Sequence, residues 1–179
     1  MKGLLRLAGG VDHITYYFGV LASWLVLFSC LISAGNALSR YLFSISSNAW
    51  LEIQWQLFSG IFLLGSAYVL QKNGHVRVDL FYGSASPRTK LWIDVFGIVF
   101  FLFPTMGVLT YFGWTFFVPS FLSGEHSSNT GGLLFWPVKL LMPIGFGLVF
   151  VQGCAELIKR FAALQGLTDE PEEYEKPLQ

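Results

Sequence analysis

The sequence predicts an all-α integral membrane protein with four transmembrane helices and an amphipathic interfacial helix after the first of them. Of its 179 residues, 54% are hydrophobic and only 12% are charged, whereas about 25% are charged in a typical soluble domain. The mean hydropathy is +0.57. The 18 Phe, 6 Trp and 7 Tyr residues suit a surface that meets lipid. The lipid bilayer is therefore the expected surroundings of this chain.

Four stretches without a formally charged side chain predict the spans. These runs are 14–39, 53–71, 95–124 and 140–155, with 26, 19, 30 and 16 residues. A bilayer core of about 30 Å needs roughly 20 helical residues, so the fourth run reaches that length only if Trp136 and Pro137 begin its helix. We expect spans at about 14–37, 53–71, 92–118 and 136–158, all within a membrane domain of residues 1–164. Pro104 is expected to kink the third span.

The first connection has an amphipathic pattern. Leu38, Tyr41, Leu42 and Ile45 follow i, i+3, i+4, i+7 spacing, which is typical of a helix that lies along the membrane interface. An extension of the first span explains the same spacing equally well. Trp50 then follows as an interfacial anchor.

Turn and capping residues punctuate the later connections. Asn73-Gly74 is expected to end the second span, and 75–79 then alternates polar and apolar residues, as in an extended segment. Ser86-Pro87 predicts the start of another helix. Residues 169–179 hold five acidic residues and one basic residue, so we expect 165–179 to be a disordered acidic tail in the cytoplasm.

Lysine and arginine predict the orientation. The N-terminus, the second connection and the C-terminus together hold nine of these residues, whereas the first and third connections hold only Arg40 and Lys139. The positive-inside rule therefore places both termini in the cytoplasm. A cleaved signal peptide is the alternative for the first span, but its apolar stretch exceeds the usual 7–15 residues of a signal core.

The sequence contains no pattern typical of catalysis or of a cofactor. Glycine-rich phosphate loops, nucleophile elbows and metal-ligand spacings are absent, and all three histidines lie outside the apolar runs, which argues against haem. Cys30 and Cys154 lie singly within apolar runs and are interpreted as small packing residues. A formal net charge of zero argues against nucleic-acid binding. We expect no enzyme activity and no cofactor.

Glu52 is the ionisable residue closest to a predicted span. Helical spacing places it on one face with Gln56 and Ser59, as in a polar contact with a partner helix or a proton site. Because Trp50 marks the interface, we favour the other interpretation, in which Glu52 lies wetted at the headgroup level. Small residues, among them Gly145, Gly147 and Gly153, thin one side of the fourth span and permit close helix packing.

The order of these features resembles the small, Q-type membrane subunit of tripartite ATP-independent periplasmic (TRAP) transporters, from about residue 12 to residue 160. The residues that carry the resemblance, and that we take as structural or partner-contact candidates, are Asn36, Arg40, Trp50, Glu52, His75, Arg77, Asp79, Glu125, Trp136 and Pro137. The fragments around them are short, but their order and spacing together are fairly specific.

The resemblance implies a four-span subunit of the bacterial inner membrane with no activity of its own. It implies two protein partners: a large membrane subunit that carries substrate and sodium ions, and a periplasmic substrate-binding protein that delivers the solute, usually a carboxylate. In that arrangement the small subunit braces the static part of the large one. Because this chain stops after the fourth span, we expect the large subunit to be a separate chain.

Two other classes of protein stay open at this point. A four-helix proton-coupled small transporter acting as a dimer needs a membrane-embedded carboxylate, and a buried, titrating Glu52 would support it. A structural subunit of a different membrane complex is the second alternative.

The predicted orientation can be tested by cysteine labelling. Single cysteines at Ser86 and Ser128, in a background that lacks Cys30 and Cys154, are expected to react with an impermeant thiol reagent from opposite sides of the membrane. Two spans separate the cytoplasmic second connection from the N-terminus, and the external third connection follows one span later. Labelling of both positions from the same side would contradict the four-span topology.

Overall fold

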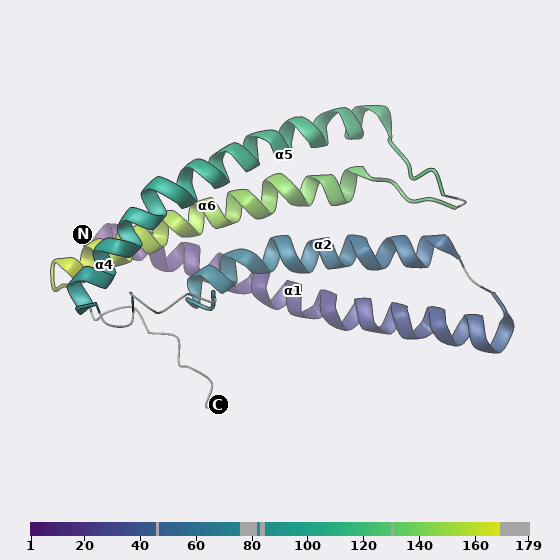
Figure 1. The fold of residues 1–179 in the computed structure, drawn as a ribbon, viewed down its shortest axis with the longest axis horizontal. Coiled ribbons are helices and arrows are strands. Elements are labelled where there is room, and N and C mark those ends of the chain that lie inside the picture. The colour runs from purple at the N-terminus through teal and green to yellow at the C-terminus, as the bar shows by residue number, and fades with distance from the viewer. Residues whose placement is uncertain (46, 76–81, 83–84, 130, 169–179) are drawn as a thin grey trace.

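The computed structural model consists of long helices that run along one common direction (Figure 1). It describes all residues except 46, 76–81, 83–84, 130 and 169–179. The elements are α1 (Lys2–Phe43), α2 (Asn48–Gln71), α4 (Pro87–Gly97), a π-helix η1 (Ile98–Leu102), α5 (Phe103–Ser123) and α6 (Trp136–Leu164). Since α4, η1 and α5 follow one another without a break, the described residues form four helices that are long and apolar enough to cross a membrane.

The all-α membrane class is confirmed, and each helix contains one of the four charge-free runs. The helices are longer than the runs: α1 has 42 residues, or about 63 Å at 1.5 Å per residue, against a bilayer core of about 30 Å. Charged residues that bound the runs do not end α1 and α6, which continue past Arg40 and Glu156 respectively. The membrane boundaries within each helix, and the division into 1–164 and 165–179, remain predictions.

The first connection differs from the expected interfacial helix. Helix α1 continues without interruption through Leu38, Tyr41 and Leu42 to Phe43, so the amphipathic stretch belongs to the same helix as the first span, as the alternative interpretation expected. The sequence before Phe43 contains no proline and only the single glycine Gly35 near that end, and good helix formers propagate a helix that already exists. The helix ends at Ser44, whose left-handed φ of 53° lets its N–H bond the carbonyl of Arg40.

The residues that were expected to end or begin helices lie at helix ends. Helix α2 ends at Gln71, and Asn73 takes a left-handed φ of 52°. The Ser86 hydroxyl accepts a hydrogen bond from the N–H of Thr89 and caps α4, with Pro87 in the first turn. Helix α6 begins at Trp136. The segment 75–79 falls mostly among the residues that the structure does not describe.

The third span contains a π-helical turn directly before Pro104. In η1 the N–H of Phe103 bonds the carbonyl of Ile98, five residues earlier. Proline has no N–H, and its ring clashes with the carbonyl four residues before it. A π-turn at this point widens the helix and relieves that clash, which is the local distortion that Pro104 was expected to cause.

Helix α6 holds the assembly together, because it packs against α1, α2, α4 and α5. Helices α1 and α2 form one antiparallel pair and α5 and α6 another (Figure 1). Two of the glycines that were expected to permit close helix packing, Gly145 and Gly153, lie in contacts of α6 with α2 and η1. A Cβ at Gly145 would come within 2.7 Å of the Leu63 carbonyl oxygen on α2, and one at Gly153 within 2.7 Å of Leu102. Glycine therefore lets the helices approach closely there.

Most large apolar side chains point outward. Trp24, Phe62, Phe100 and Phe112 are examples that are more than half exposed. A protein in water rarely exposes so much apolar surface, whereas lipid or a partner subunit covers such side chains without cost. The packed interior of the described residues is correspondingly small and consists mainly of Ala, Leu and Val.

A matched pair of glycine substitutions tests the α2–α6 contact. Gly145→Ala is expected to force the two helices apart and to lower the melting temperature in detergent, at a cost of about 1–3 kcal/mol typical of overpacking. Gly147→Ala is the control, because the nearest atom to its Cβ is Thr110 Cγ2 at 3.9 Å. Equal melting temperatures for the two variants would contradict the close contact.

Candidate functional site

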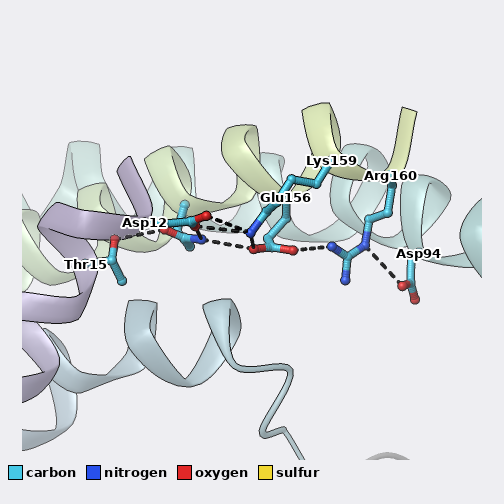
Figure 2. Close-up of polar contacts among 7 residues, drawn as sticks. Asp12, Thr15, Asp94, Glu156, Lys159 and Arg160 are labelled. Carbon is cyan, nitrogen blue, oxygen red and sulfur yellow. Dashed lines mark hydrogen bonds and ion pairs between the residues drawn. The ribbon is translucent and has the colours of Figure 1, made fainter. Parts of the chain in front are cut away.

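Two polar clusters lie at opposite ends of the helices. The first, which we call the seven-residue network, joins α1, α4 and α6 near the chain termini and consists of Asp12, Thr15, Asp94, Gln152, Glu156, Lys159 and Arg160 (Figure 2). The second, which we call the Glu52 clamp, consists of Glu52, Ser127, Asn129 and Leu133 and joins α2 to the connection between α5 and α6. Together they account for most of the buried charged side chains of the described residues.

The uncharged part of the seven-residue network ties α1 to α6. Thr15 Oγ1 donates to Gln152 Oε1 at 2.9 Å, and Gln152 Nε2 donates to Asp12 Oδ1 at 2.7 Å and to Glu156 Oε1 at 3.0 Å. Thr15 and Gln152 are almost completely buried. Both ends of the Gln152 amide are therefore used, which compensates the cost of burying it.

The charged part extends the network to α4. Arg160 is 3% exposed and lies between two acids: it forms an ion pair with Glu156, which is 2% exposed, and its Nε donates to Asp94 Oδ2 at 3.1 Å. Lys159 pairs with Glu156 and lies 3.1 Å from Asp12 Oδ1. Three carboxylates thus face two cations. A buried charge is costly unless it is paired and hydrogen-bonded, and here each one is.

The sequence spacing of the polar residues on α6 explains why they lie on one face of the helix. Glu156 follows Gln152 by four residues, and Lys159 and Arg160 follow Glu156 by three and four residues, spacings at which side chains are neighbours on a helix surface. Glu156 pairs with both Lys159 and Arg160, as this spacing allows. Asp12, Thr15 and Asp94 come from helices far away in the sequence, so no local spacing indicates that they join the network.

The Glu52 clamp centres on a buried carboxylate. Glu52 Oε2 accepts the N–H of Leu133 at 2.7 Å, and Oε1 accepts Asn129 Nδ2 at 2.8 Å and the hydroxyl of Ser127. The residue is 3% exposed. The expectation that Glu52 is wetted was wrong, because the third connection folds back over α2 and covers it. The alternative interpretation was a polar contact with a partner helix or a proton site, whereas the contacts of Glu52 come from a loop of its own chain.

Contacts next to Glu52 fix the same connection. Gln56, one helical turn further along α2, donates to the carbonyl of Leu134 at 3.2 Å. The ring of Trp55 lies 6.0 Å from that of Phe135. Residues His126 and Leu134 form an isolated antiparallel bridge, which closes the connection into a short loop. The face of α2 that holds Glu52 and Gln56 therefore positions the whole segment.

Glu125 and Lys139 close the loop on its α6 side. Their side chains form an ion pair, and the Lys139 ammonium lies 4.2 Å from the centre of the Phe116 ring. The hydrogen bond from Lys139 holds the pKa of Glu125 below its ordinary value. A carboxyl group with a depressed pKa stabilises the fold at neutral pH and loses this contribution only as the pH falls below about 4.5.

The other candidate residues lie apart from these two clusters. Asn36 and Arg40 line a cavity between α1 and α2, and Arg40 is not among the partners of Glu52. Trp50 and His75 are exposed. Trp136 begins α6 with Pro137, and its ring meets that of Phe121 edge-on at 5.4 Å. Arg77 and Asp79 lie outside the described residues.

The described residues offer no centre for metal or redox chemistry. No group of three His, Cys, Asp or Glu side chains among them could hold a metal ion. The buried acids are occupied by cations or by hydrogen-bond donors that stabilise the carboxylate anion. What these two clusters accomplish is to fix helices and a loop, and neither leaves a charged group open at mid-span.

A comparison with protein families decides the identity of the chain. Residues 29–163 match the family described as "Tripartite ATP-independent periplasmic transporters, DctQ component". The chain belongs to this family. No curated protein matches it. The match contains the whole Glu52 clamp and every member of the seven-residue network except Asp12 and Thr15.

Membership identifies the protein as the small membrane subunit of a TRAP transporter, a multi-pass membrane protein. The predicted resemblance is thereby confirmed. The four-helix proton-coupled transporter and the subunit of an unrelated complex are both set aside. The buried carboxylate of this DctQ subunit, which would have favoured the proton-coupled alternative, forms three hydrogen bonds to its own loop instead.

Hydrogen exchange can test the Glu52 clamp. Glu52→Gln preserves the shape of the side chain but removes the charge that three donors share, so the amide of Leu133 is expected to exchange roughly tenfold faster or more. Glu125→Gln is the control, since the Glu125 carboxylate faces Lys139 and not Leu133. Unchanged exchange at Leu133 in Glu52→Gln would show that the carboxylate does not hold the loop.

Proposed function

We propose that this DctQ subunit is a rigid, non-catalytic brace for the large membrane subunit of a TRAP transporter in a bacterial inner membrane. In this proposal the large subunit performs sodium-coupled secondary uptake, and a periplasmic binding protein delivers a carboxylate-type solute. The brace itself binds neither solute nor sodium. Both termini and the seven-residue network lie on the cytoplasmic side, and the Glu52 clamp lies on the periplasmic side.

The observation that carries the proposal is the pairing of the buried ionisable groups. Glu156 is occupied by Arg160 and Lys159, and Glu52 by three donors of the third connection. A transporter needs a polar site near the bilayer centre that can exchange its ligand. Side chains committed to one another at the two ends of the helices favour a fixed structure over such a site.

The clamp supports a brace in a second way. It holds Ser127, Asn129 and Leu133 against α2, so these parts of the loop that the proposal places in the periplasm have a fixed position. A moving domain of the large subunit needs a fixed reference in the membrane, and the binding protein needs a fixed surface on which to dock. The exposed aromatic side chains offer the large subunit an extensive apolar surface.

Reconstitution into liposomes tests the proposal. The chain alone, the large subunit alone and both together are incorporated, each with the binding protein outside and an inward sodium gradient. Solute uptake is expected only with both subunits, because the chain supplies support and the large subunit supplies the transport path. The controls omit the binding protein or collapse the sodium gradient with an ionophore.

Two results would contradict the brace. Solute-driven sodium flux through the chain alone would make it a carrier. Equal uptake with and without the chain would show that the large subunit needs no support.

A further inference from the structure

A cavity between α1 and α2, away from both polar clusters, has no role in the proposed brace. It has a volume of about 580 Å³ and lies toward the connection between the two helices, at the end opposite the chain termini (Figure 1). Five of its lining residues are polar, namely Ser33, Asn36, Arg40, Tyr41 and Gln54. Leu51 and Ala37 complete the lining.

Asn36 gives the cavity its chemical character. It is only 7% exposed, and the structure gives its side-chain amide no hydrogen-bond partner among the described residues. The Gln54 amide, on the facing helix, likewise has none within the described part of the chain. A buried amide is normally hydrogen-bonded, so the amide of Asn36, which lines the cavity together with the half-buried Gln54, indicates a ligand with hydrogen-bonding groups.

The charge of the lining selects an anion. Arg40 contributes a guanidinium cation, and no carboxylate is among the residues that line the cavity. A guanidinium has five N–H donors, so Arg40 can hold an anion while it keeps its other contacts. Arginine, two amides and the hydroxyls of Ser33 and Tyr41 together suit a group with several acceptor oxygens and one negative charge.

The position of the cavity identifies the source of the anion. Asn36 lies seven residues before the end of α1 at Phe43, a depth of about 10 Å along the helix. Tyr41 at 86% exposure and Trp50 at 49% lie at the same end, as aromatic residues do at a membrane interface. Phospholipid phosphates occupy this level, and the apolar side chains of Leu51 and Ala37 suit the start of the acyl chains.

We propose that Asn36, Arg40 and Gln54 form a binding site for the phosphodiester headgroup of a phospholipid from the leaflet on the side of the α1–α2 connection. The phosphate lies against the Arg40 guanidinium and accepts hydrogen bonds from the two amides. The bound lipid completes the contact between α1 and α2 where the helices enclose the cavity. The site does not require the large subunit.

Native mass spectrometry of the full chain in mild detergent tests this site. Phosphatidylglycerol is expected to remain bound, whereas diacylglycerol with the same acyl chains, which lacks the phosphate, is not. Arg40→Gln should weaken binding roughly tenfold or more, and Asn36→Leu roughly threefold or more, the ranges expected for charged and neutral hydrogen bonds. Arg40→Lys should retain part of the affinity. Arg88→Gln, an exposed arginine at the other end, is the matched control and should bind normally.

Several outcomes would overturn the proposal. They are equal retention of diacylglycerol, unchanged binding in Arg40→Gln and Asn36→Leu, or displacement of the lipid by an equal concentration of soluble glycerophosphate. An Arg40 that cross-links to an acidic residue of the large subunit, with no lipid bound to the chain alone, would assign the cavity to a protein partner instead.

A second measurement uses the unaltered protein, so it holds even if a variant fails to fold. A phospholipid with a photoreactive group beside its phosphate is cross-linked to the chain, and the adducts are mapped by peptide mass spectrometry. Adducts within 33–41 and 51–54 are expected. Adducts confined to other segments would refute the site.

Discussion

The rest of the structure depends on the compensation of charge where α6 meets α1 and α4. The side chains of Arg160 and Glu156 are both almost fully buried. Removal of either one would leave the other as an isolated buried charge, which strongly destabilises a fold. Their bonds to Asp94, Lys159 and, through Gln152, to Asp12 fix three helices relative to one another. The apolar contacts of a membrane protein cannot do this alone, because lipid competes for them.

Buried carboxylates are compensated by different kinds of partner at the two ends of the helices. At the end near the termini, carboxylates are neutralised by cations, whereas at the other end Glu52 is held by two side chains and one backbone N–H. Between these ends the contacts are apolar and close, as at Gly145. The helices are therefore fixed to one another by polar contacts at both ends and by close apolar packing between them.

The sequence predicts the helices better than it predicts their polar contacts. Charge-free runs and the punctuation at Asn73, Ser86 and Trp136 are local signals, so they located four helices and most of their ends. They did not predict that α1 would run on to Phe43, because the amphipathic stretch before it satisfies two local interpretations equally. The pairing of Glu156 with Arg160 was also local, at i and i+4.

The contacts that sequence reasoning missed are those that depend on tertiary arrangement. Asp12 and Lys159 are 147 positions apart, and no pattern in either segment predicts that the two residues pair. Glu52 lies two residues after Trp50, a predicted interfacial anchor, so the local sequence led us to expect that water surrounds the Glu52 carboxylate. Its hydrogen bonds come from Ser127, Asn129 and Leu133. The Ser, Gly and Asn content of that connection predicts a loop, but not the helix against which the loop packs.

The π-turn at Ile98–Leu102 has a geometric consequence for the third span. One additional residue in a turn advances the downstream side chains by about 100° around the axis relative to an unbroken α-helix. The span therefore changes phase partway along. Asp94, which contacts Arg160, and Gly113, which lies against Pro143, are 19 residues apart and would point about 100° away from each other on an unbroken α-helix. The additional residue of the π-turn offsets this angle, so one span directs both residues toward α6.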